Sequence, residues 1–64
     1  MKCNPSDYRA PFVVTYVDDH EQEFEDLFAA VAMAERIVED GGFVQVFDDD
    51  GEEVPLFVQW NLGA

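Results

Sequence analysis

The sequence has very little positive charge, since only three of its 64 residues are Lys or Arg. These three, Lys2, Arg9 and Arg36, are too few to form the basic surface that binding to DNA, RNA or an anionic membrane requires. No apolar run approaches the roughly 20 residues of a membrane-spanning helix. We therefore expect no direct binding of nucleic acid and no association with a membrane.

Cysteine and histidine are almost absent as well, with one residue of each. A lone Cys3 excludes an internal disulfide and a cysteine-based zinc site. His20 lies in a predicted turn among acidic residues, and no Ser or Cys is placed to serve it as a nucleophile. No apolar stretch of the kind found in secretory signals follows Lys2. We predict a cytoplasmic protein that is not an enzyme, with no catalytic residues, no metal site and no cofactor.

Acidic residues, in contrast, are abundant: 15 Asp and Glu give a formal net charge of -12. Hydrophobic residues make up 48% and aromatic residues 14%, which is too much for a disordered acidic tail. The length predicts one small domain over residues 1–64. Dense charge of one sign destabilises a compact state by self-repulsion, so we expect the charge to serve the function.

The first half of the chain predicts two strands after an irregular lead-in over residues 1–11, which contains Pro5 and Pro11. Residues 12–17 are β-branched or aromatic and predict the first strand. Residues 21–25 alternate between acidic and other side chains, and predict a short second strand paired with the first.

Residues 27–40 predict the helix, because Ala, Leu, Met and Glu are strong helix formers. Asp26 is placed to cap its N-terminus, and Gly41 can adopt the left-handed conformation that ends a helix. An apolar stripe at helical spacing predicts the buried face; its members are Leu27, Ala30, Val31, Ala34, Ile37 and Val38.

The second half predicts a hairpin. Residues 43–47 form a strand, the Asp-Gly pair of residues 48–52 forms the turn, and residues 53–60 return as the last strand. A core over residues 12–60 and a tail over 61–64 complete the chain. The fold class is α+β: a small antiparallel sheet of three or four strands with one helix on one face, in β(β)αββ order.

One helix covers only one face of such a sheet, so the other face is left for water or a partner. Alternation assigns the aliphatic positions to the helix and the aromatic positions Phe43, Phe47 and Phe57 to the open face. These phenylalanines are the predicted self-association face of a monomer or weak homodimer.

The acids fall into clusters, which we predict to bind a partner. The hairpin tip holds Asp48, Asp49, Asp50, Glu52 and Glu53; the second strand holds Glu21, Glu23 and Glu25; the outer face of the helix holds Glu35 and Glu39. The tip does not predict a calcium site, because aligning Gly51 with the glycine of an EF-hand loop places Val46 at the first ligand position. Alternate acids on a strand lie about 6.6–6.8 Å apart, of the same order as charges along nucleic acid.

Small size, extreme acidity, a plain α+β fold and no catalytic apparatus resemble the DNA-mimic inhibitors encoded by phages. The resemblance is closest to small anti-CRISPR proteins that occupy the DNA-binding surface of a type I surveillance complex (Cascade). It is one of character over the whole chain and includes no sequence motif. It implies host-defence evasion in the cytoplasm of a bacterial host, through a basic nucleic-acid-binding protein or complex as partner.

Two other functions are compatible with the sequence. One is a small acidic interaction module, such as an antitoxin-like or assembly domain, that pairs through its open sheet face. The other is a housekeeping protein of a halophile, in which acidity maintains solubility in salt.

Overall fold

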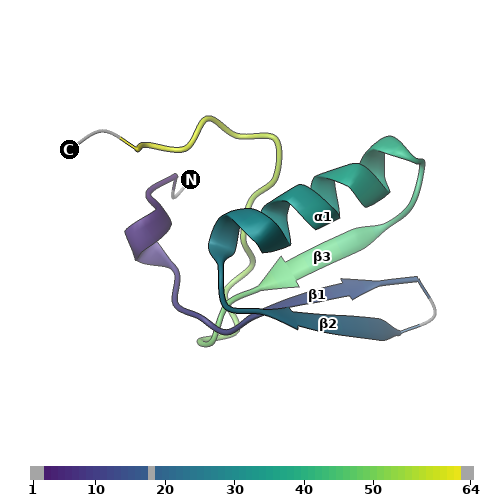
Figure 1. The fold of residues 1–64 in the computed structure, drawn as a ribbon, viewed down its shortest axis with the longest axis horizontal. Coiled ribbons are helices and arrows are strands. Elements are labelled where there is room, and N and C mark those ends of the chain that lie inside the picture. The colour runs from purple at the N-terminus through teal and green to yellow at the C-terminus, as the bar shows by residue number, and fades with distance from the viewer. Residues whose placement is uncertain (1–2, 18, 63–64) are drawn as a thin grey trace.

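The computed structural model describes residues 3–17 and 19–62, and its sheet has three antiparallel strands (Figure 1). They are β1 (Phe12–Tyr16), β2 (His20–Phe24) and β3 (Val44–Phe47). The order is β2-β1-β3, which places β1 in the centre and leaves β2 and β3 as edges. The predicted α+β class and the strands expected at 12–17, 21–25 and 43–47 are confirmed, with ends that differ by about one residue.

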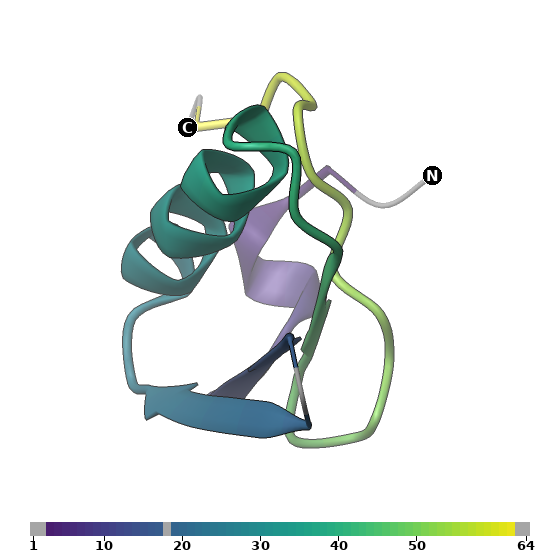
Figure 2. The ribbon, with the colours of Figure 1, turned by 90° about the vertical axis from the view of Figure 1, so that its right-hand side faces the viewer.

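The helix α1 (Leu27–Glu39) covers one face of the sheet (Figure 2). As predicted, Asp26 caps it, because its carboxylate accepts a hydrogen bond from the Ala29 N–H at 3.2 Å. At the other end Gly41 has φ +88°, and the Gly42 N–H donates to the Ile37 carbonyl at 2.9 Å. This pairing is the Schellman arrangement that satisfies the last carbonyls of a helix.

The core lies between α1 and the sheet, and the predicted helix stripe supplies much of it. The sheet contributes four buried residues that face this stripe: Phe12 and Val14 of β1, and Val44 and Val46 of β3. The buried helix residues are Leu27, Ala30, Val31 and Ala34, with Ile37 half-buried.

Val38 departs from the predicted stripe, because 37% of its surface is exposed. Val38 lies in the last turn of α1, beyond Ala34, which is the last buried residue of the helix.

The strand expected over residues 53–60 is wrong. The chain makes one bridge to β3 at Phe47 and Glu53, where the Val54 N–H donates to the Val46 carbonyl at 2.8 Å, and then leaves the sheet. Pro55 has no N–H for a ladder, and Phe57 has φ +57°, a left-handed conformation that lies outside the β region of a regular strand. The segment crosses to α1, where the Phe57 N–H donates to Glu35 Oε2 at 2.8 Å.

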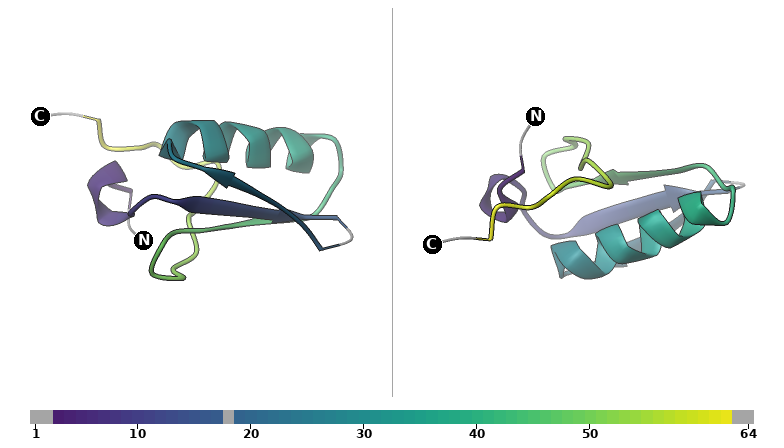
Figure 3. Two further views of the ribbon diagram at one scale, coloured as in Figure 1. Left: turned by 60° about the horizontal axis from the view of Figure 1, so that its bottom comes forward. Right: turned by 90° about the horizontal axis from the view of Figure 1, so that it is seen from above.

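The N-terminal lead-in is also more ordered than expected. It contains the short 3-10 helix η1 (Pro5–Asp7), followed by Tyr8, which is buried in the core. Trp60 packs edge-to-face against both Tyr8 and Phe28, with ring centroids 5.9 and 6.1 Å apart. The Asn61 N–H donates to the Cys3 carbonyl at 2.8 Å, so the first and last described segments lie side by side (Figure 3).

Across residues 3–17 and 19–62, the structure contains no helix long and apolar enough to cross a membrane.

Candidate functional site

The acidic hairpin tip is built around one carboxylate that does not reach the surface. Asp48 is 5% exposed. Its Oδ1 accepts hydrogen bonds from the N–H groups of Asp50 and Glu52 at 3.0 and 2.8 Å, and its Oδ2 accepts from the Arg9 N–H at 3.4 Å. Asp48 therefore shapes the turn and joins it to the lead-in. It is not available to a partner.

The other acids of the tip are exposed: Asp49, Asp50, Glu52 and Glu53. Gly51, with φ +80°, supplies the left-handed residue that the turn requires. The Asp49 N–H donates to the Arg9 carbonyl at 2.9 Å, so the turn is fixed to the lead-in on its backbone as well. These carboxylates thus project from a braced loop.

The acids of β2 lie on the open face of the sheet. Glu21 pairs with Thr15, and Glu23 pairs with Val13. Thr15 and Val13 point to the face of the sheet opposite to that of the buried Phe12 and Val14. Both glutamates are exposed, and their predicted common face is confirmed by this register. Glu25 is exposed too, but it follows the end of β2 and takes no part in the ladder.

The open face has acids along both of its edges. Val13 pairs with Glu23 on one side and with Phe47 on the other, and the bridge from Phe47 to Glu53 extends the row. Three strand spacings of about 4.8 Å separate the ends of this row, which gives about 14 Å between the backbones of Glu23 and Glu53. Half-buried side chains, Val13, Thr15, Gln45 and Phe47, fill the centre.

The two acids of the predicted helix cluster have different environments. Glu39 is exposed at the end of α1, whereas Glu35 is half-buried and binds the Phe57 N–H. Glu35 therefore attaches the C-terminal segment to the helix, and only Glu39 remains freely presented to solvent.

The three phenylalanines of the predicted self-association face do not assemble. Phe43 is 76% exposed and shares a hollow with Thr15 and Gln45 of the open face. Phe47 lies in the central row of that face. Phe57 is 57% exposed, but its backbone is bound to the helix layer. Because the chain leaves the sheet after Val54, the alternation that placed Phe57 on the open face does not apply.

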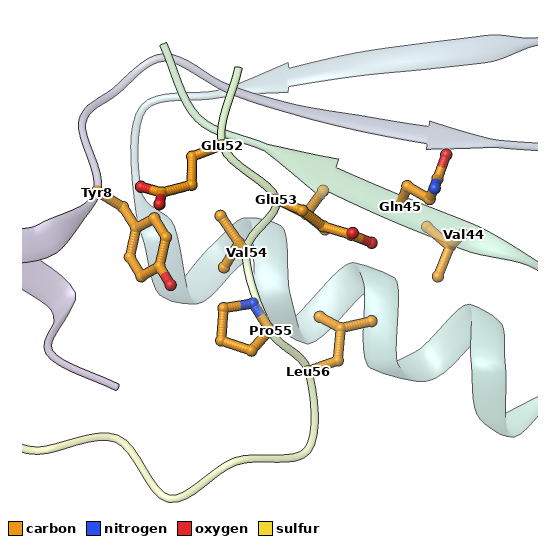
Figure 4. A pocket seen from close by; sticks show the side chains of 9 residues that line it. Tyr8, Val44, Gln45, Glu52, Glu53, Val54, Pro55 and Leu56 are labelled. Atoms are coloured by element: carbon orange, nitrogen blue, oxygen red, sulfur yellow. The ribbon is translucent and has the colours of Figure 1, made fainter. Parts of the chain in front are cut away.

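A groove lies between the outer edge of β3 and the segment that leaves the sheet (Figure 4). Its volume is about 640 Å³. Val44 and Val46 line it from β3, and Tyr8, Val54 and Leu56 line it from the other side. This groove was not predicted from the sequence, which indicated an irregular lead-in and a last strand. The groove forms because the chain departs from the sheet instead of continuing as that strand.

Among residues 3–17 and 19–62, no group of three or more His, Cys, Asp and Glu side chains is arranged to hold a metal ion. His20 is exposed, and its ring stacks on that of Tyr16, with the two ring centroids 5.8 Å apart. Comparisons of the chain with known protein families, with curated proteins and with solved structures found no match.

The sequence analysis did not predict the burial of two residues, Asp48 in the hairpin tip and Tyr8 in the core. For Asp48 a signal was present, since an Asp at the start of a turn commonly accepts from the backbone N–H two residues later. For Tyr8 the two flanking prolines indicated only a loop, and no periodic pattern marked its ring for burial.

Proposed function

We propose that this protein is an acidic DNA mimic, an inhibitor that occupies the nucleic-acid-binding surface of a basic protein complex. The target that we propose is a type I CRISPR surveillance complex (Cascade), whose binding of target DNA the inhibitor would block in a phage-infected bacterial cell.

The observation that supports this proposal is the acidic border on both edges of the open sheet face. Its two edges, at Glu23 and Glu53, stand about 14 Å apart by strand spacing. The major groove of DNA is about 12 Å wide between the backbones that bound it. Two carboxylates at one edge, Glu21 and Glu23, and one at the other, Glu53, would offer a basic channel negative charge on both sides of the sheet face, as the two backbones of a duplex do.

Electrostatics favour such a partner over others. A channel lined with Lys and Arg attracts a body of net charge -12, most strongly within a Debye length, which is about 10 Å at 0.1 M salt. The negative field of this protein itself repels DNA and anionic lipid. Complementary charge also fixes the register of the complex, since misplaced like charges cost several kcal/mol.

Neutralising the open face tests the proposal. The test variant carries Glu21→Gln, Glu23→Gln and Glu53→Gln. The control variant carries Asp7→Asn, Glu39→Gln and Asp40→Asn, which removes the same net charge from exposed positions away from the open face. Inhibition of target-DNA binding by the purified surveillance complex is measured for each variant at increasing salt.

We expect the test variant to lose at least tenfold in inhibition, the control variant to lose less than threefold, and DNA and protein to exclude each other from the complex. If both variants inhibit equally, only net charge matters and the open face is not the binding surface. If neither the parent nor the variants displace DNA, charge mimicry of this target is wrong.

The second candidate is an interaction module that binds through apolar contacts, and the exposure of Phe43 favours it. Phe43→Ala separates the two functions in the same assay. It should leave inhibition unchanged under charge mimicry and abolish partner binding under the interaction-module function.

A further inference from the structure

β3 is an edge strand, and among the described residues its outer side is paired at one end, through the bridge to Glu53. The Val46 carbonyl points outward, because it accepts from the Val54 N–H. Residues two apart in a strand direct their backbone groups to the same side, so the N–H and carbonyl of Val44 and the N–H of Val46 point outward too. Within residues 3–17 and 19–62, no other backbone hydrogen bond reaches them.

These outward groups open into the groove beside β3. The segment after Val54 diverges instead of continuing the ladder, so no strand within residues 3–17 and 19–62 pairs with the outer side of β3 beyond the bridge at Glu53. The opposite wall is apolar, with Tyr8, Val54 and Leu56. A volume of about 640 Å³ is within the range of about 300–1,000 Å³ typical of ligand sites.

Charge selects the occupant of this groove. Glu53 is exposed, and its side chain extends from the diverging segment toward β3 (Figure 4). Among residues 3–17 and 19–62, no basic side chain lines the groove. A second copy of this chain would bring another net charge of -12 against it, so self-pairing at this edge is opposed.

We infer that the edge of β3 is a docking site for a basic, extended segment of a partner protein, which adds as a strand. The backbone of that segment would pair with Val44 and Val46, one apolar side chain would enter the groove, and a Lys or Arg would lie at Glu53. The inference goes beyond the proposed function, because strand addition at this edge does not require that the acids of the open face imitate DNA.

The other edge of the sheet, β2, is a weaker candidate. It also carries acids, Glu21 and Glu23, but its residues from His20 to Glu23 are exposed and line neither of the two hollows. Plain charge attraction could hold a basic peptide there, without the apolar contact that the groove beside β3 provides. Binding at β2 is therefore an outcome that the experiment must distinguish.

The experiment uses the whole protein and a short peptide in which Lys and Val alternate, followed by amide NMR at low salt. We expect saturable binding, with the largest shifts and slowed amide exchange at Val44 and Val46. A peptide N-methylated on its pairing edge and a peptide with Lys and Val in separate blocks should each bind at least tenfold more weakly. Equal binding of these control peptides would overturn strand addition, as would shifts centred on β2 or the absence of binding.

Two charge reversals complete the test. Glu53→Lys should weaken binding of the alternating peptide by about fivefold, and Glu39→Lys, which makes the same change in net charge on α1, by less than twofold. Equal effects of the two variants would mean that the peptide responds to net charge and not to the groove.

Discussion

Asp48 shows how one acidic residue can have a different task from its neighbours in a charged cluster. Its carboxylate is buried and accepts from three backbone N–H groups, those of Arg9, Asp50 and Glu52. Its neighbour Asp49 is exposed, and no such bonds to its carboxylate occur among the described residues. The first is a structural residue of the turn, and the second belongs to the charged surface.

Replacing Asp48 should therefore destabilise the protein. Asp48→Ala leaves the N–H groups without their acceptor, and we expect the free energy of unfolding to fall by about 2 kcal/mol. Asp48→Asn retains an oxygen for Asp50 and Glu52 and should cost less. Urea unfolding followed by Trp60 fluorescence measures both, with Asp49→Ala as the control, expected within about 0.5 kcal/mol of the parent. A parent-like Asp48→Ala variant would show that the carboxylate bonds contribute nothing.

At the scale of elements, the C-terminal segment is bound to the helix through Glu35 and not to the sheet. The Phe57 N–H that Glu35 accepts belongs to a residue in the left-handed region, which is costly for a bulky side chain. The hydrogen bond and the packing of Trp60 on Tyr8 and Phe28 offset that cost. The groove beside β3 depends on this attachment, because the attachment holds the segment away from the sheet edge.

Removing the attachment should loosen the segment. We expect Glu35→Ala to lower the free energy of unfolding by about 1 kcal/mol and Glu35→Gln by less, because the amide oxygen can still accept. Glu39→Ala is the matched control one turn further along α1, with no expected loss. Urea unfolding gives the free energies, and near-ultraviolet circular dichroism of Trp60 reports the segment. Equal stability of the Glu35→Ala and Glu39→Ala variants would contradict this role.

At the scale of the whole molecule, the net charge of -12 is spread over a small body with a Cα radius of gyration of 11.2 Å. Acids occupy the hairpin tip, β2 and the end of α1, so repulsion acts from several sides. Such repulsion destabilises the compact state.

Salt should relieve this repulsion, since charges more than about 10 Å apart are screened at 0.1 M. We expect the Tm to rise as NaCl is added from very low concentration, and to rise less in the open-face variant Glu21→Gln, Glu23→Gln, Glu53→Gln. Differential scanning calorimetry measures both. A flat or falling Tm for the parent would mean that the acids are compensated within the fold.

The sequence by itself determined the local elements of this protein. The helix follows from an apolar stripe, the cap at Asp26 and the stop at Gly41, all of which act within a few residues of one another. The strands at 12–16 and 44–47 follow from β-branched residues and alternation in the same way. The α+β class and the shared face of Glu21 and Glu23 were therefore predictable.

The tertiary structure alone decided the environments that depend on distant residues. Asp48 is buried because Arg9, 39 positions away, meets it. The last segment leaves the sheet, and Glu35, 22 positions from Phe57, binds it there. Alternation within residues 53–60 could not reveal this departure, because buried and exposed positions alternate equally well against a helix layer and within a strand. Long-range packing thus separated the structural acids from those of the surface, and it alone created the groove beside β3.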